Sequence, residues 1–298
     1  MYDDIRKNKI KTGIIVSIFM AMITIIIYSI CYLFDFQEYA IVLAGSIAII
    51  STITTYYNCD KVVLKSVRAR KADLDEDRKI NNILDGLMIS SGLEIRPELY
   101  VINSEQPNAF ATGRNPEHSI ICVTRGLLEK LNYYELEAVI AHELSHIRNY
   151  DIRLSAVISV MAGFIVILSD MFLRSYMRPS RKNNDRDSNK TDAIVALIGM
   201  VLLIISPIVS SLIQLAVSRK REYLADATAV EFTRNPDGLV SALIKISNDD
   251  SELDVASKSN AYMYIENPYL KNRTKQISNL FSTHPTLEER IEAIRNLK

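Results

Sequence analysis

The chain has 298 residues, 48% of them hydrophobic, and its 35 basic side chains are balanced by 35 acidic ones. This length allows one good-sized catalytic domain or two modest ones, and the zero net charge gives no general case for nucleic-acid binding. The odd number of cysteines, with Cys31 inside an apolar run, argues against a disulfide framework and fits a reducing compartment.

Two long apolar runs begin the chain. The first, residues 12–34, contains no charged side chain, and a helix of about 20 apolar residues can cross a bilayer. It is too long for a removable signal peptide and lacks a small-residue cleavage site. The second, residues 39–57, follows a short acidic turn. We predict an N-terminal transmembrane hairpin in residues 1–60, although a helix buried in a soluble core could mimic either run.

Residues 61–153 are polar and combine helix and strand signals. Apolar side chains recur at helical spacing in some stretches, and β-branched runs bounded by turn residues occupy others. The predicted helices are 73–94 and 134–150, and the predicted strands are 98–102, 108–112 and 119–124. We expect this block to be the first part of a small α+β domain.

Two further apolar runs, residues 154–173 and 193–217, predict a second membrane hairpin in residues 154–217. The later run contains Pro207, which membrane helices tolerate better than soluble ones. Residues 218–298 are polar and helical in pattern, so we expect them to complete the domain that the hairpin interrupts. Buried soluble helices are again the competing interpretation.

Lysines and arginines in the short loops indicate the orientation in the membrane. The N-terminal stub and the segment after residue 60 are strongly basic, and the turn between the first two runs has no basic residue. Both basic segments should therefore face the cytoplasm. The loop between the third and fourth runs is also basic, although two full crossings would place it outside. Either the early charges dominate, or the second hairpin does not fully cross.

The helix predicted at 134–150 carries His142-Glu143-Leu144-Ser145-His146. Two histidines four residues apart project from one face of a helix and can bind one metal ion together. Glu143, next to the first histidine, can reach a metal-bound water as a general base. The pattern indicates a catalytic zinc site, and the competing interpretation is a pair of ordinary surface histidines.

A catalytic zinc site needs a third protein ligand and one open position. No third histidine stands at metzincin spacing, and Asp170, near a thermolysin-like spacing, has no supporting pattern. Glu222 is the better candidate, because Glu222 and Asp226 share a helix face and Asp226 could hold the outer nitrogen of a ligand histidine. Taken alone, such a pair is more often a solvated helix face.

In order along nearly the whole chain, these features resemble the HtpX-like membrane peptidases of the M48 gluzincins, relatives of the CAAX prenyl proteases. Four apolar runs favour the HtpX-like group, since the CAAX proteases have more. The motifs that carry the resemblance are Asn108-Ala-Phe-Ala-Thr-Gly113, His142-Glu-Leu-Ser-His-Ile-Arg-Asn-Tyr-Asp151, Arg221-Glu-Tyr-Leu-Ala-Asp226 and His284-Pro-Thr-Leu-Glu-Glu-Arg290-Ile291. The implied fold is mainly α within an α+β class: an integral membrane protein with about four transmembrane helices and a gluzincin-type zinc protease domain containing a small β-sheet.

The resemblance implies one zinc ion per chain, held by His142, His146 and Glu222, with Glu143 activating a zinc-bound water. Zinc rather than another divalent ion is inferred from the ligand types. His284 is then the candidate for stabilising the oxyanion, although it could be a solvated or packing histidine before a helix. The residues expected to support the ligands are Asp226, Asp151 and Arg290; the competing interpretation of Asp151 is an ordinary C-terminal flank of its helix.

The segment 108–112 resembles the edge strand on which such proteases lay an extended peptide, and its candidate substrate-binding residues are Asn108, Ala109, Phe110, Ala111 and Thr112. Backbone pairing tolerates many sequences, which suits quality control of misfolded or damaged membrane proteins; a plain hairpin arm is the competing interpretation. We expect a multi-pass protein of the cell membrane with a cytoplasmic active site, protein or peptide substrates, contact with the lipid bilayer and no nucleic-acid partner. The alternatives are a CAAX prenyl-protein endopeptidase and a non-catalytic zinc-containing membrane scaffold.

Overall fold

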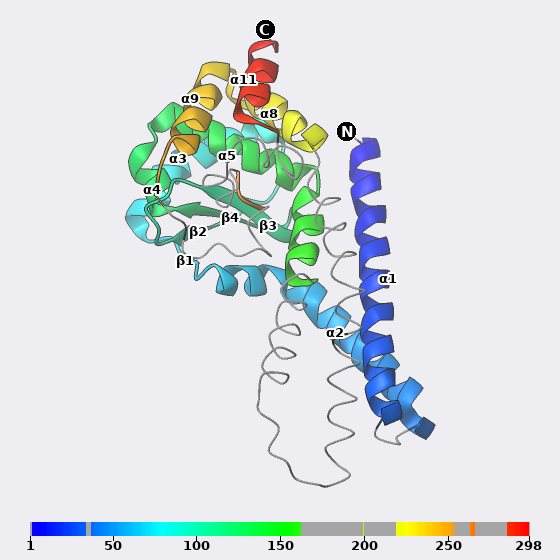
Figure 1. Cartoon of the computed structure of the whole chain (residues 1–298). Helices are drawn as coiled ribbons and strands as arrows, with labels where there is room; N and C mark the ends of the chain where they lie inside the picture. The colour runs from blue at the N-terminus through cyan, green and yellow to red at the C-terminus, as the bar shows by residue number, and fades with distance from the viewer. Residues whose placement is uncertain are drawn as a thin grey trace.

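The computed structural model describes residues 2–33, 37–161, 199, 219–251, 253, 263–265 and 285–297. Figure 1 shows a sheet covered by helices, from which two long helices extend. These are α1 (Tyr2–Leu33) and α2 (Gln37–Ser66), which pack against each other and include the first two predicted apolar runs. Among the helices of the described part of the chain, none is both long and apolar enough to cross a membrane.

The predicted third and fourth runs, 154–173 and 193–217, lie outside the described residues except for 154–161 and Gly199. Residues 151–161 are helical and pack against the middle of α1. This apolar contact contains Ile15, Phe19 and Ile23 of α1 and Leu154, Val157, Ile158 and Met161 of the later helix. The segment that follows the histidine motif is therefore joined to the N-terminal helix by a buried apolar surface.

The sheet has four described strands in the order β1-β2-β4-β3. They are β1 (Arg70–Lys71), β2 (Glu98–Ile102), β3 (Ala109–Asn115) and β4 (His118–Thr124). β2 and β4 are parallel, whereas β3 forms an antiparallel hairpin with β4 and lies at the edge. Sequence analysis predicted all of these strands except the two-residue β1.

Successive side chains of a strand point to opposite faces of the sheet, and both faces here are buried. One face packs with α3 (Leu74–Ser91) and α5 (Tyr133–Arg148) in the largest apolar cluster. The other face packs on the C-terminal end of α2, where Phe110 and Cys122 meet Val63 and Val67. Burial of the two faces fixes the strand register and the orientation of β3.

Helices complete the layer above the sheet, as Figure 1 shows. They are α4 (Arg125–Lys130), α8 (Arg219–Thr233), α9 (Pro236–Ser247) and α11 (Leu287–Arg295), together with α3 and α5. The predicted helices at 73–94 and 134–150 are confirmed with slightly shorter limits. The first ends at Gly92, whose left-handed φ of 66° terminates the helix.

The start of α5 is fixed by several hydrogen bonds. Asn132 and Glu135 form a reciprocal capping box. The Glu135 carboxylate also accepts hydrogen bonds from Ser241 at 2.6 Å and Lys245 at 2.7 Å, both in α9. These contacts hold the motif helix against α9 and so set the position of the two histidines, which follow two and three turns further on.

Candidate metal centre

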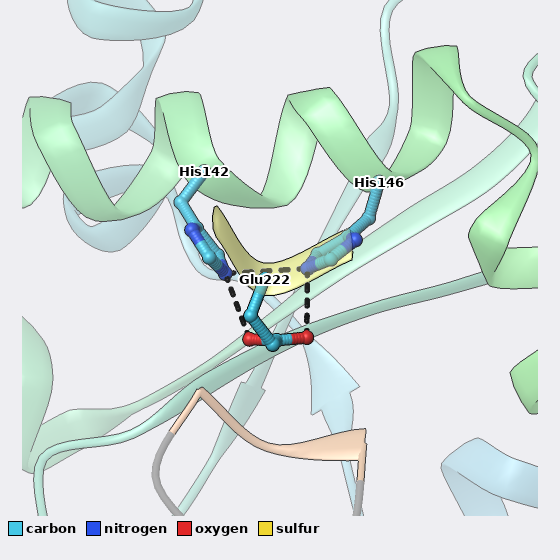
Figure 2. A group of neighbouring side chains, drawn as sticks. All are labelled: His142, His146 and Glu222. Carbon is cyan, nitrogen blue, oxygen red and sulfur yellow. Dashed lines mark hydrogen bonds and ion pairs between the residues drawn. The ribbon is translucent and has the colours of Figure 1, made fainter. Parts of the chain in front are cut away.

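His142 and His146 project from the buried side of α5, as their four-residue spacing requires. Their Nε2 atoms lie 3.2 Å apart, and the two rings meet edge to face. His142 is only 1% exposed. Figure 2 shows both rings directed at the same point between α5 and Glu222.

Glu222 reaches this point from the first turn of α8. Its two carboxylate oxygens lie 3.7 Å from Nε2 of His142 and 3.8 Å from Nε2 of His146. The three side chains form a group that could hold a metal ion. Of the two acids considered from the sequence, Glu222 is at the centre, and Asp170 lies outside the described residues.

The spacing of these donor atoms fits a tetrahedral metal site. Two nitrogen or oxygen ligands about 2.0–2.2 Å from zinc at a tetrahedral angle are about 3.3–3.6 Å from each other. The three observed separations, 3.2, 3.7 and 3.8 Å, lie close to that range. Two imidazoles and a carboxylate also form a donor set that zinc accepts in catalytic sites.

Each histidine is held from behind by a carboxylate. Nδ1 of His142 lies 2.9 Å from Asp226, and Nδ1 of His146 lies 3.0 Å from Asp151. Such partners fix the ring orientation and the tautomer, leaving Nε2 for a metal. Tyr150, with a φ of 60°, forms the turn after α5 that brings Asp151 back under His146.

Both supporting carboxylates are accompanied by arginines. Arg290 of α11 donates two hydrogen bonds to Asp226, and Nε of Arg221 lies 3.6 Å from Asp151. Burial alone would raise the pKa of Asp226, but Arg290, together with His142, outweighs it and holds this pKa below its ordinary value. Asp226 therefore stays ionised beside His142.

The charges around His146 stabilise its protonated form when no metal is bound. Burial opposes the charge, but the Asp151 hydrogen bond and the nearby Glu222 and Glu143 carboxylates outweigh it and raise the pKa of His146 from 6.5 to about 9. The same negative surroundings attract a divalent cation, which needs the ring in its neutral form. A proton and a metal ion therefore compete for this side chain.

Glu143 lies beside the metal group and is almost completely buried. Burial raises the pKa of Glu143, and the neighbouring histidines His142 and His146 offset part of that rise. A carboxylate with a raised pKa accepts a proton more readily near neutral pH. The backbone N–H of Ala111, in β3, donates a hydrogen bond to this carboxylate.

The backbone of β3 presents polar groups toward the site. The N–H of Thr124 donates to the carbonyl of Asn108, so these residues form a hydrogen-bonded pair of the ladder. Since hydrogen-bonded and open pairs alternate, the backbone groups of Ala109 and Ala111 point away from β4. The contact between Ala111 and Glu143 agrees with this pattern.

The described residues bring together most of the side chains selected from the sequence, including His142, Glu143, His146, Glu222 and the three supporting residues. The segment 108–112 lies beside them, whereas His284 falls outside the described residues. Sequence reasoning assigned no role to Arg221 or to Ile265, whose carbonyl accepts a hydrogen bond from Arg290 at 3.1 Å. Arg221 could have been noticed beside Glu222 in its motif; Ile265 carries no sequence signal.

Comparisons with known proteins match this architecture. The model of "Peptidase family M48" matches residues 74–298. A protein described as "Protease HtpX homolog" from Dictyoglomus thermophilum is 41% identical over 294 residues, covering 99% of this chain and 94% of its own length. Homologues with the same description from Caldanaerobacter subterraneus and Lactobacillus helveticus are 40% and 39% identical, covering all of this chain and 98% and 100% of their own.

Among solved structures, the crystal structure of Ste24p from S. mikatae superposes with a TM-score of 0.53. The match covers 99% of this chain and 67% of the other, at 17% sequence identity. At that identity the likeness concerns the fold alone.

Proposed function

Because the chain belongs to peptidase family M48 and is an HtpX-like metalloendopeptidase, we propose that it uses one zinc ion to cleave membrane proteins at the cytoplasmic face of the cell membrane. The observation that carries the metal assignment is the convergence of His142, His146 and Glu222 on one point. Their separations match tetrahedral coordination with one position left for substrate or water. These three residues are the proposed ligands.

Zinc bound there supplies Lewis-acid chemistry, acidifying a water molecule and polarising the scissile carbonyl. Glu143 takes the proton from the attacking water and passes it to the leaving amine. Its burial and raised pKa support this role, because the carboxylate gains affinity for the proton that it must carry. His284 is the proposed donor to the oxyanion, and Arg290 and Asp151 support the site through the ligand histidines.

The edge of β3 that faces away from β4 is the proposed place where an extended substrate pairs. This edge lies beside Glu143, and the backbone polar groups of Ala109 and Ala111 point outward from it, away from β4. An added strand is held by its main chain, so affinity depends little on sequence. That property supports a quality-control protease, which must accept many unfolded segments.

Membrane attachment is proposed from the four apolar runs of the sequence. The domain limits follow from them: hairpins in residues 1–60 and 154–217, and a protease domain divided between residues 61–153 and 218–298. The exposed surfaces of α1 and α2 support this proposal, because large apolar side chains such as Ile14, Ile25, Val42 and Ile50 are more than two-fifths exposed there. Many large apolar side chains exposed on one pair of helices indicate a surface that contacts a partner or lipid.

The test uses purified full-length protein and the substitution Glu143→Gln. We expect this variant to retain its zinc and to lose cleavage of an unfolded membrane protein and of a casein-like substrate. Wild-type cleavage by Glu143→Gln would overturn the mechanism. A prenylated CAAX peptide is assayed in parallel to distinguish the two substrate classes. If the enzyme cleaves this peptide in preference to the unfolded membrane protein, it is a CAAX endopeptidase and not a quality-control protease.

A further inference from the structure

Ile265 is bonded through both of its backbone polar groups at the edge of the active site. Its N–H donates to the carbonyl of Ala109 at 3.0 Å, on the side of β3 that faces away from β4. Its carbonyl accepts a hydrogen bond from Nη1 of Arg290 at 3.1 Å. In Figure 1 the short orange segment 263–265 lies beside β3. One residue of the chain thus occupies a backbone hydrogen-bonding position on this edge.

The side chains of residues 264 and 265 pack on the β3 edge from opposite faces of the sheet. Ile265 is 2% exposed and belongs to the same apolar cluster as Ala109. Tyr264 packs on the opposite face, with its ring centroid 5.1 Å from that of Phe110. The segment is therefore seated on β3 by packing as well as by hydrogen bonds.

An extended peptide added to β3 would need the same partners. Strand addition at this register offers a substrate N–H to the carbonyl of Ala109, which Ile265 now uses. A substrate carbonyl in the place of the Ile265 carbonyl would meet the same Arg290 guanidinium. Because one edge cannot pair with both at this position, the internal segment and an external strand exclude each other.

We propose that Ile265 occupies a substrate subsite and that the segment 263–265 inhibits the protease until a substrate strand displaces it. The inference rests on the proposed function, in which the edge of β3 binds the substrate. The displaced side chain leaves an apolar site beside Ala109, so the substrate residue that takes this position is aliphatic. Cleavage then requires an unfolded segment long enough to replace the internal segment 263–265, which protects folded proteins from attack.

A reversible lock tests this exclusion in full-length enzyme loaded with zinc. Ile265 and Ala109 are joined directly by a backbone hydrogen bond of 3.0 Å, and two residues so joined have Cα atoms about 5–6 Å apart, within the range that a disulfide bridges. Ala109 and Ile265 also share one apolar cluster, so their side chains lie on the same face. In the double variant Ala109→Cys/Ile265→Cys, oxidation should hold the segment on β3, and a phosphine reductant should release it.

The measurement is kcat/KM for an unfolded protein substrate, with zinc content determined in each state. We expect oxidation to lower kcat/KM by about tenfold or more, as when the competent fraction falls by that factor, with recovery on reduction and unchanged zinc. Each single cysteine variant, treated identically, is the control. An oxidised double variant as active as its own reduced form would overturn the inference.

A second variant removes the aromatic contact that seats the segment. Tyr264→Ala should raise kcat/KM and lower the inhibition constant of a non-cleavable extended peptide, because the edge is open more often. The matched control is Leu253→Ala, which removes a buried side chain from the same cluster as Tyr264. If Tyr264→Ala only loses activity, as Leu253→Ala does, the segment is a structural brace. A wild-type protein that contains no zinc and cleaves no substrate would instead refute the proposed function itself.

Discussion

Arg290 and Asp226 form a buried, two-bonded ion pair behind the metal group. Nε and Nη2 of the guanidinium lie 2.9 and 2.6 Å from the two carboxylate oxygens, and both side chains are at most 2% exposed. Asp226 in turn lies 2.9 Å from Nδ1 of His142. α11 is thereby connected through α8 to the motif helix, although these elements are distant in sequence. The orientation of a proposed zinc ligand depends on a residue near the end of the chain.

The first prediction concerns Arg290→Met. The substitution leaves the Asp226 carboxylate buried without this partner, which costs about 3–5 kcal/mol of unfolding free energy. Thermal unfolding of the purified full-length protein measures the loss of unfolding free energy. Arg295→Met on the exposed side of α11 is the control and should unfold near the wild-type temperature. Equal stability of the two variants would show that the buried pair does not hold α11 in place.

The second prediction concerns the carboxylate behind the other histidine. Asp151→Asn keeps the shape of the side chain but removes the charge that lies 3.0 Å from Nδ1 of His146. Partners of this kind contribute about 10–100-fold to metal affinity. Zinc release to a competing chelator should therefore require a correspondingly lower chelator concentration. An unchanged zinc affinity would mean that Asp151 does not orient the ring.

The third prediction is a pH dependence of stability that arises at the start of α5, two turns before His142. Burial opposes ionisation of Glu135, but hydrogen bonds from Lys245, Ser241 and the Asn132 backbone outweigh it and lower the pKa of Glu135 below 4.5. A depressed folded-state pKa stabilises the fold above the unfolded value, and this contribution disappears as pH falls through the folded pKa.

Glu135→Gln should accordingly lower the unfolding free energy by about 1–3 kcal/mol at neutral pH, a range that allows for the half-exposed Lys245 partner. As pH falls below 4.5 and through the lowered pKa of folded Glu135, the difference from wild type should shrink. Urea unfolding over a pH series from neutral to acidic measures it, with the exposed Glu129→Gln as control. A difference that stays constant with pH would assign the effect to packing instead of charge.

Much of the candidate site could be predicted from the sequence, because its signals are local. The histidine pair and the Glu222–Asp226 pair each follow from the period of one helix, and the α+β character with a small sheet follows from short β-branched runs between amphipathic stretches. These expectations agree with α5, α8 and the three longer strands. Arg290 was selected only through a motif resemblance, since nothing local indicates a buried ion pair with α8.

Other features depend on tertiary structure and leave no mark in the sequence. Tyr150 must adopt a left-handed backbone conformation to bring Asp151 under His146, a geometry that no residue pattern predicted. Ile265 reaches β3 through main-chain hydrogen bonds, which every residue type can form. The membrane arrangement of the apolar runs and the part played by His284 remain predictions.

The central claim is that His142, His146 and Glu222 hold the catalytic zinc while Glu143 moves the proton. It is tested most directly by measuring zinc content and proteolytic rate together in Glu222→Ala and Glu143→Gln. The account predicts one zinc per chain in wild type and in Glu143→Gln, little in Glu222→Ala, and activity in wild type alone. A Glu222→Ala protein that keeps one zinc per chain and cleaves at the wild-type rate would contradict it.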